Sequence, residues 1–163
     1  MECGYKLRPR GKVADWEAEG CEAVLGGALG SISSCYVIQE GPVYKMWFTW
    51  QQSHCIAYGE STDGKHWGLP TVVLTPRYQS EWEIHEVSHP TVIYRDGLYH
   101  MWYTGQYKAG EADGTSHIFC AVSTDGIHFE RVSDQPVLLP EEPWEKAAVM
   151  KSEAKRSWKT MLR

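Results

Sequence analysis

The sequence predicts an all-β fold of repeated four-stranded antiparallel sheets, because one residue pattern occurs twice. Tyr-Lys-Met-Trp-Phe-Thr at 44–49 and Ser-Thr-Asp-Gly-Lys-His-Trp at 61–67 return as Tyr-His-Met-Trp-Tyr-Thr at 99–104 and Ser-Thr-Asp-Gly-Ile-His-Phe at 123–129. The copies lie 55 to 62 residues apart and consist of strand-forming residues and Asp-Gly turns. Self-similarity of this kind is typical of a chain that repeats one small sheet.

The first copy predicts four strands in a meander. They cover residues 35–38, 43–50, 54–60 and 66–74, with turns at 40–42 and 62–64. Alternation of apolar and polar residues in the second strand indicates a half-buried sheet. Four meandering strands per repeat are the pattern of a propeller blade.

The second copy predicts the same four strands. They cover residues 90–93, 98–105, 116–122 and 127–139, with Asp-Gly turns at 96–97 and 125–126. Asp-Gly between apolar runs is a strong hairpin signal, because both central residues of the tight turn need positive φ. The second copy carries a longer loop at 106–115, and we expect this loop to reach over a binding face.

We expect one domain, a propeller fragment that covers the whole chain. Its parts are a blade repeat at about 31–75, a blade repeat at about 86–140, and an incomplete strand or helical tail at 141–163. Trp-Glu recurs at 16–17, 82–83 and 144–145, each near the expected start of an inner strand. Repeat units bury their apolar faces against neighbours, so a possible homo-oligomer, a dimer or larger, is predicted.

Composition excludes several partners. The net charge is -5 and the pI is about 5.8, so the chain lacks the basic surface that nucleic acid requires. No apolar run approaches the about 20 residues of a membrane span. Residues 1–10 show no secretory signal, which makes the cytoplasm the default localisation unless the true start lies upstream. The five scattered cysteines indicate neither a disulfide framework nor a metal site.

The repeated motifs resemble those of a known superfamily. Val-Ile, a Gly turn, Tyr-x-Met-Trp-Tyr-Thr-Gly, Ala-x-Ser-Thr-Asp-Gly-x-His-Phe and Pro-Val-Leu are similar to the blade repeat of the five-bladed β-propeller glycosidases, which include glycoside hydrolase families 43, 32 and 130. The similarity covers about residues 16–145. It implies a partial propeller of the five-bladed type, with carbohydrate as the partner.

The resemblance also implies where a site would lie. In that superfamily the innermost strand of each blade starts near a proline, and acidic residues beside it project into a central funnel. Pro90 matches this proline, so the candidate funnel residues are Glu86, His85 and His89. We expect the two histidines to contact sugar. They lie in an extended segment rather than on a helix, so no metal and no cofactor is predicted.

Catalysis is left open by the sequence. Glycoside hydrolysis requires two carboxyl groups, and Glu86 is the candidate catalytic acid. His89 stands where many active relatives place Asp, and Ser31, aligned with Glu86 in the first copy, offers no carboxylate. One hypothesis is a glycoside hydrolase-like propeller that acts on or binds a glycan at the funnel. The alternative is a non-catalytic, truncated fragment that binds carbohydrate or assembles into an oligomeric ring.

Residues that repeat in both copies are predicted to be structural. Asp63 and Asp125 are expected to stabilise their turns. The repeated large side chains are expected to pack between adjacent blades; they are Tyr44, Met46, Trp47, Tyr99, Met101 and Trp102. Three aromatic residues break the repeat and are therefore the candidates for stacking on sugar; they are Trp50, Trp82 and Tyr107.

Overall fold

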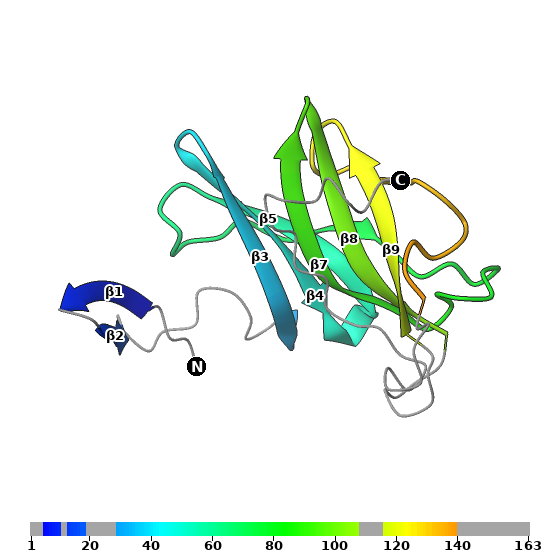
Figure 1. The fold of residues 1–163 in the computed structure, drawn as a ribbon, viewed down its shortest axis with the longest axis horizontal. Coiled ribbons are helices and arrows are strands. Elements are labelled where there is room, and N and C mark those ends of the chain that lie inside the picture. Colours follow the sequence, from blue (N-terminus) through cyan, green and yellow to red (C-terminus); the bar gives the residue numbers. More distant parts are fainter. Residues whose placement is uncertain (1–4, 11–12, 19–28, 108–115, 140–163) are drawn as a thin grey trace.

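The computed structural model describes residues 5–10, 13–18, 29–107 and 116–139. Two four-stranded antiparallel sheets make up most of this part (Figure 1). The expected incomplete strand or helical tail at 141–163 and most of the 106–115 loop lie outside the described residues. No helix in the described part of the chain is long and apolar enough to cross a membrane.

The first sheet has the strand order β3-β4-β5-β6. Its strands are β3 (Ile32–Glu40), β4 (Val43–Trp50), β5 (Cys55–Ser61) and β6 (Thr71–Leu74). A short 3-10 turn, Gln51–Ser53, connects β4 to β5. The fourth strand begins at Thr71, later than the expected 66, because a side-chain-stabilised loop after Ser61 delays the return of the chain to the sheet.

The second sheet repeats this meander, with the order β10-β9-β8-β7. Its strands are β7 (Glu86–Arg95), β8 (Leu98–Gln106), β9 (Ser116–Ser123) and β10 (Glu130–Arg131). The expected strand at 127–139 is reduced to β10 and an isolated bridge between Ile118 and Leu138. The predicted fold class, an all-β partial propeller of four-stranded blades, is confirmed.

A third, two-stranded sheet was not expected from the sequence. It pairs β1 (Tyr5–Arg10) with β2 (Val13–Ala18) in an antiparallel hairpin. The repeat pattern marks only the Trp-Glu pair at 16–17 in this segment, and that pair does not predict a hairpin.

The two inner strands, β3 and β7, share an irregularity at the same place. Ser33 and Ser88 each pair with a threonine of the next strand, and the register shifts directly after each of them. Within each shift one residue has a left-handed backbone, Ser34 with φ 50° and His89 with φ 52°. A matching β-bulge makes Ser34 and His89 equivalent positions, and it makes Ser31 the counterpart of Glu86.

The main core lies between the two sheets, because β7 packs against β3, β4 and β5. Trp47 of the first sheet and Tyr99 of the second have ring centroids 5.7 Å apart, and Met101 joins the same buried cluster. The predicted packing between blades is therefore confirmed for these three. Met46 and Trp102 lie in two smaller clusters on the opposite faces, since successive side chains of a strand alternate.

The Asp-Gly turns are of two kinds. At Asp96 and Gly97 both residues have positive φ, 52° and 82°, as the tight hairpin requires. The turn after β5 is wider: only its glycine has positive φ, and Asp63 Oδ1 accepts hydrogen bonds of 2.8 Å from the backbone N–H groups of two following residues. Asp125 does the same after β9. The two aspartates are structural as predicted, but their turns are not two-residue hairpins.

Candidate functional site

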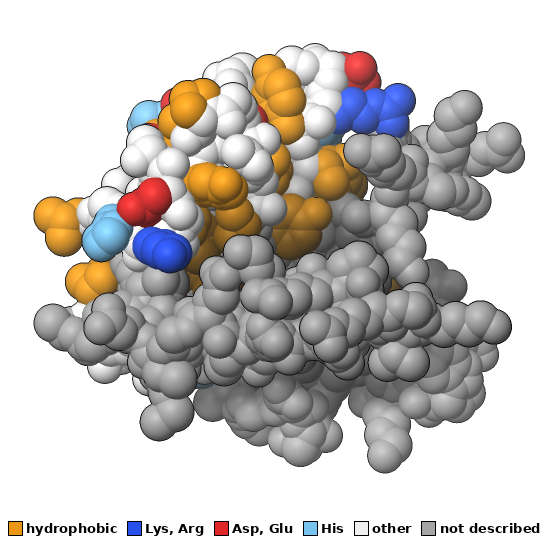
Figure 2. All heavy atoms as spheres, turned by 90° about the vertical axis from the view of Figure 1, so that its left-hand side faces the viewer, with side chains coloured by type: hydrophobic (Ala, Val, Ile, Leu, Met, Phe, Trp, Pro, Cys, Tyr) orange, Lys and Arg blue, Asp and Glu red, His pale blue; other side chains and the backbone are white. Residues whose placement is uncertain are grey.

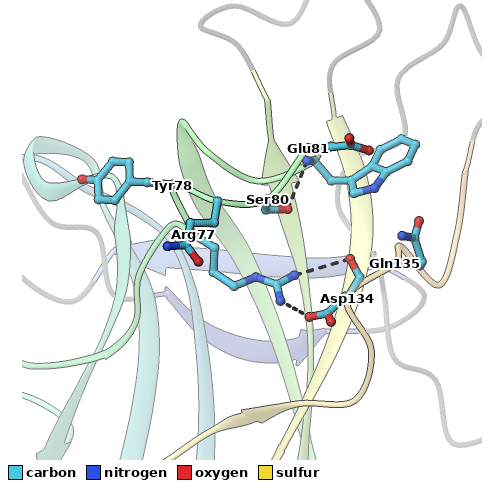
Figure 3. A pocket seen from close by; sticks show the side chains of 8 residues that line it. Arg77, Tyr78, Ser80, Glu81, Asp134 and Gln135 are labelled. Carbon is cyan, nitrogen blue, oxygen red and sulfur yellow. Dashed lines mark hydrogen bonds and ion pairs between the residues drawn. The ribbon is translucent and has the colours of Figure 1, made fainter.

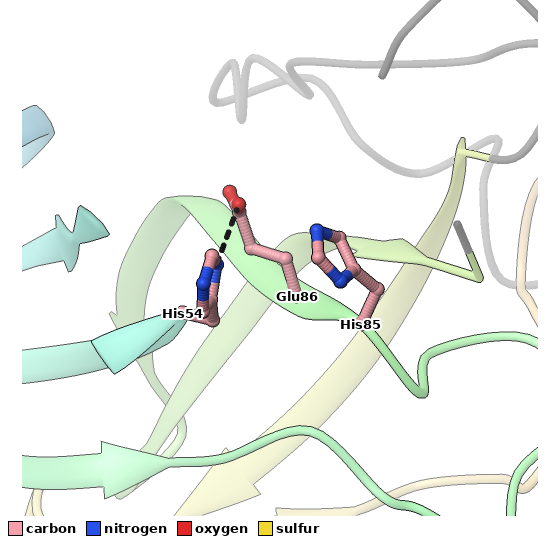
Figure 4. Close-up of side chains that lie close together, drawn as sticks. All are labelled: His54, His85 and Glu86. Carbon is pink, nitrogen blue, oxygen red and sulfur yellow. Dashed lines mark hydrogen bonds and ion pairs between the residues drawn. The ribbon is translucent and has the colours of Figure 1, made fainter. Parts of the chain in front are cut away.

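Glu86 begins the innermost strand of the second sheet and faces a histidine from the first. Its Oε2 lies 3.4 Å from Nδ1 of His54 (Figure 4). The Glu86 side chain is 20% exposed and that of His54 is 49% exposed, so the carboxylate is accessible from solvent while resting against the neighbouring blade.

The backbone fixes His54 beside Glu86. His54 follows the 3-10 turn and has a left-handed backbone with φ 51°, and its N–H donates to the carbonyl of Gln51 at 3.2 Å. The N–H of Val87 donates to the His54 carbonyl at 3.1 Å. This last bond joins the two blades next to Glu86, so the approach of His54 depends on main-chain geometry as well as on its side chain.

His85 completes a group of three side chains. Its ring centroid lies 5.0 Å from that of His54, and its backbone N–H donates to the carbonyl of Gln106 in β8 at 2.9 Å. One ligand atom from each of His54, His85 and Glu86 lies within 4.8 Å of the others. We call these three residues the His-His-Glu cluster.

The cluster contains two of the predicted site residues and one that sequence reasoning missed. The sequence predicts His85 and Glu86 as site residues because they precede Pro90. His54 belongs to a short connection in the other repeat, where no motif accompanies it, and only the packing of one blade on the other brings it close. The available signal was a lone histidine after a polar turn, which is too weak to select a site.

His89, also predicted, lies on the same strand but outside the cluster. Its left-handed backbone directs the N–H to Oγ1 of Thr49 in the first sheet, at 2.9 Å. Its Nδ1 lies 3.0 Å from Oγ of Ser88. His89 thus contacts the junction between the blades.

The three predicted sugar-stacking aromatics are dispersed. Trp50 packs beside Phe48, and its indole N–H donates to the carbonyl of Leu29 at 2.7 Å. Trp82 is half-buried, with its ring 5.0 Å from that of His117 in an edge-to-face arrangement. Tyr107 is 49% exposed. None of the three belongs to the His-His-Glu cluster.

A polar hollow of about 650 Å³ lies elsewhere, next to the segment that precedes β7 (Figure 3). Arg77, Trp82 and Asp134 line it, and the Arg77 guanidinium is paired with Asp134. The hollow shares no residue with the His-His-Glu cluster. The principal cation of the hollow, Arg77, is already neutralised by a carboxylate.

A fully buried carboxylate, that of Glu83, pairs with the Arg77 side chain that lines the hollow. It is 0% exposed and forms ion pairs with Arg77 and, at 2.6 Å, with Arg131. Its other oxygen accepts a 2.8 Å hydrogen bond from the Tyr103 hydroxyl. Burial, reinforced by the charge of Glu83, raises the pKa of Tyr103 well above its usual range. Two arginine side chains and one hydroxyl group bind the Glu83 carboxylate. We therefore infer that Glu83 stabilises the fold and does not take part in a reaction.

Comparison with known sequences points to carbohydrate-active relatives, although no family model matches the chain. An uncharacterised protein of Mycobacterium tuberculosis is 29% identical over 126 residues, covering 71% of this chain and 39% of the relative. A probable sucrose-6-phosphate hydrolase of Psychromonas ingrahamii is 29% identical over 151 residues, covering 88% and 24%. A beta-1,2-mannobiose phosphorylase of Thermoanaerobacter is 34% identical over 84 residues, covering 44% and 28%. The chain spans less than half the length of these curated relatives.

Solved structures with the same fold include glycoside hydrolases. A family 117 glycoside hydrolase of the marine bacterium Zobellia galactanivorans has a TM-score of 0.61 at 14% identity, covering 72% of this chain and 43% of its own. A protein solved as an RGII complex has a TM-score of 0.60 at 17% identity, with coverage of 74% and 42%. A thermostable family-43 glycoside hydrolase has a TM-score of 0.52 at 21% identity, with coverage of 66% and 33%.

The resemblance read from the blade motifs is confirmed: the described sheets share the fold of family 117 and family-43 glycoside hydrolases, and the sequence is similar to a probable sucrose-6-phosphate hydrolase and to a beta-1,2-mannobiose phosphorylase.

Proposed function

We propose that the chain is a glycan-binding module of the glycosidase-like propeller type, with its site at the His-His-Glu cluster. The observation that carries this proposal is the position of Glu86: a solvent-accessible carboxylate at the start of the innermost strand, with a histidine of the adjacent blade 3.4 Å away. The glycoside hydrolases among the solved structures of this fold support a glycan as the ligand.

The chemistry of the cluster suits a sugar. A carboxylate accepts hydrogen bonds from neighbouring hydroxyl groups, and an imidazole donates one and accepts another. His54 and His85 flank Glu86, so donors and acceptors alternate over a short distance. Such a set can bind a vicinal diol with each hydroxyl satisfied.

Binding is favoured over hydrolysis because the described cluster contains a single carboxylate. Hydrolysis requires a second carboxyl group about 5–9.5 Å from the first. Ser31, the counterpart of Glu86 in the first blade, offers only a hydroxyl. A glycosidase activity is the second candidate function, and it would need its other carboxylate from outside this cluster.

Calorimetric titration against a panel of oligosaccharides tests the proposal. Glu86→Gln is expected to weaken the binding of any glycan ligand by about tenfold, since a charge-assisted acceptor is lost. Glu130→Gln, which alters an exposed acid of β10, is the matched control and should bind like wild type. Equal affinity of the Glu86→Gln protein and wild type would contradict the assignment.

A panel of aryl glycosides separates binding from hydrolysis. Turnover that Glu86→Gln abolishes would establish the glycosidase function. Turnover that survives this substitution would show that Glu86 is not the acid. Glycan binding without turnover is the outcome we expect.

We also propose that copies of the chain associate through the face of the first sheet that points away from the second. Val37 and Val72 lie on this face and are 46% and 44% exposed. Figure 2 shows apolar side chains on the described surface of one side of the molecule, with a few acidic, basic and histidine side chains between them. In a propeller this type of face packs on another blade, so a second copy can cover it.

Light scattering over a concentration series tests association. We expect a dimer or larger species that the double variant Val37→Lys with Val72→Lys dissociates. A wild-type monomer at all concentrations would contradict it.

A further inference from the structure

We propose that His54, His85 and Glu86 form a site for one divalent transition-metal ion, with Zn²⁺ as the best fit. The sequence predicts no metal, because His85 and His89, the histidine pair that it offers, lie in an extended segment rather than on a helix. In the structure the histidine that lies beside His85 and Glu86 is His54 of the other blade, and not His89. This inference concerns a different ligand from the glycan and does not rest on the proposed function.

The donor atoms select the class of ion. Two imidazole nitrogens and one carboxylate oxygen suit zinc and its neighbours in the first transition series. Calcium and magnesium prefer shells made of oxygen, which two histidines do not provide. Three protein ligands also leave the fourth position of a tetrahedral zinc ion open, to water or to another oxygen ligand.

The distances fit the size of such an ion. Ligands at about 2.0–2.2 Å from a tetrahedral zinc ion are themselves about 3.3–3.6 Å apart. His54 Nδ1 and Glu86 Oε2 are 3.4 Å apart. The full set of ligand atoms spans at most 4.8 Å. Closing the widest gap needs a movement of about 1 Å, which a small change in side-chain torsion supplies.

The backbone holds the three ligands in place. The bond from Val87 N–H to the His54 carbonyl ties the first-blade ligand to the strand that carries Glu86. The bond from His85 N–H to the Gln106 carbonyl ties the second histidine to β8. Ligands on hydrogen-bonded backbone lose little freedom on binding, which favours a built site over a chance encounter of surface groups.

A simple ion pair between His54 and Glu86 would explain only two of the three side chains in the cluster. An exposed contact between one histidine and one carboxylate contributes only about 0–1 kcal/mol and requires two groups. The cluster has a third, His85, whose ring faces the same space between the blades (Figure 4). Convergence of two imidazoles on one carboxylate is what a metal ion requires.

Metal titration of the whole 163-residue chain, stripped with a chelator and measured without glycan, tests the proposal. We expect one Zn²⁺ per chain, and a rise in the Tm as zinc is added, because the ion binds only the folded arrangement. Co²⁺ is expected to substitute and to give the visible spectrum of tetrahedral nitrogen and oxygen ligation.

Substitution of the ligands provides the decisive comparison. His54→Ala and Glu86→Gln should each weaken zinc binding by about tenfold or more. His66→Ala is the matched control, because His66 is an exposed histidine that pairs with Asp63 in a surface loop away from the cluster. Circular dichroism of each variant shows whether it is folded, and the wild-type cobalt spectrum provides an answer that needs no variant.

Three results would overturn the metal site: no saturable binding of zinc by wild type, undiminished binding by the double variant His54→Ala with Glu86→Gln, or a cobalt spectrum with thiolate charge-transfer bands. Failure of glycan binding leaves the metal result unaffected, since the titrations contain no sugar. Both proposals use the side chains of His54, His85 and Glu86, so the glycan titration is made on the metal-free chain and the zinc titration without sugar, which keeps the two results distinguishable.

Discussion

The indole N–H of Trp47 in the first blade donates a hydrogen bond of 2.8 Å to the carbonyl oxygen of Gly126 in the second. Trp47 is 0% exposed, so this bond lies within the interface between the blades. The apolar interface therefore contains a directional contact, which fixes the loop after β9 against the face of β4.

Trp47→Phe should destabilise the protein, because it leaves the Gly126 carbonyl buried without its donor. We expect the free energy of unfolding to fall by about 1–3 kcal/mol from the unpaired carbonyl, with a further loss from the smaller ring. Urea denaturation measures the difference. Trp67→Phe is the control, since its indole bonds to Gly64 within one loop and is only partly buried. A larger loss for Trp67→Phe than for Trp47→Phe would refute this account of the interface.

Gly126→Ala should cost more than Gly97→Ala. Both glycines have a left-handed backbone, with φ of 81° and 82°, so each substitution carries about 1–2 kcal/mol of backbone strain. A Cβ at Gly126 would also lie 3.0 Å from the Trp47 ring, whereas a Cβ at Gly97 would meet nothing within 4 Å. Thermal unfolding of the two variants isolates the interface contribution. An equal loss of stability in the two variants would mean that the Trp47 ring can move away from the added Cβ at no cost.

Glu83→Gln should be among the most destabilising single changes in the chain. It removes the charge that balances Arg77 and Arg131 in a fully buried position, where breaking one side of an ion pair costs about 3–5 kcal/mol. Asp134→Asn, which also removes a partner of Arg77, should cost little because the Asp134 side chain is 89% exposed. Denaturant unfolding compares the two, and similar losses would show that burial is not the deciding factor.

Asp125 makes the stability of its loop depend on pH. The His128 side chain, with the backbone N–H groups of His128 and Ile127, holds the pKa of Asp125 well below its ordinary value of about 3.9. A lowered folded-state pKa gives stability that is complete above about pH 4 and is lost as the pH falls through the folded-state value. The Tm difference between wild type and Asp125→Asn should therefore be fully present above about pH 4 and shrink as the pH falls below that value. A difference constant from about pH 7 to about pH 2 would exclude this linkage.

The repeat made the fold predictable. Strands 43–50 and 98–105 follow from alternation that appears twice, and the hairpin at Asp96 and Gly97 follows from a dipeptide that suits two positive φ values. The turns at Asp63 and Asp125 were harder to predict, because the same dipeptide also supports a wider loop when the carboxylate accepts backbone hydrogen bonds. Side-chain capping, not backbone preference, decided their shape.

The candidate site was only half predictable. Glu86 and His85 precede a proline that marks an inner strand, so their place was visible in the sequence. The position of His54 was not visible there, because its proximity to Glu86 depends on how one blade packs on the other and on a backbone hydrogen bond from Val87. In the sequence Glu83 appears only as part of a recurring Trp-Glu pair. Its burial between Arg77 and Arg131 could not be predicted, because no local sequence pattern connects these residues.

The left-handed residue shared by the two inner strands has a practical consequence. Ser34 and His89 adopt one backbone shape with different side chains, so the main chain and not the side chain specifies this bend. This position can therefore carry different side chains in the two blades without a change in backbone conformation. Ser34→His or Ser31→Glu would therefore place on the inner strand of the first blade a side chain that the second blade carries, without changing the course of the main chain.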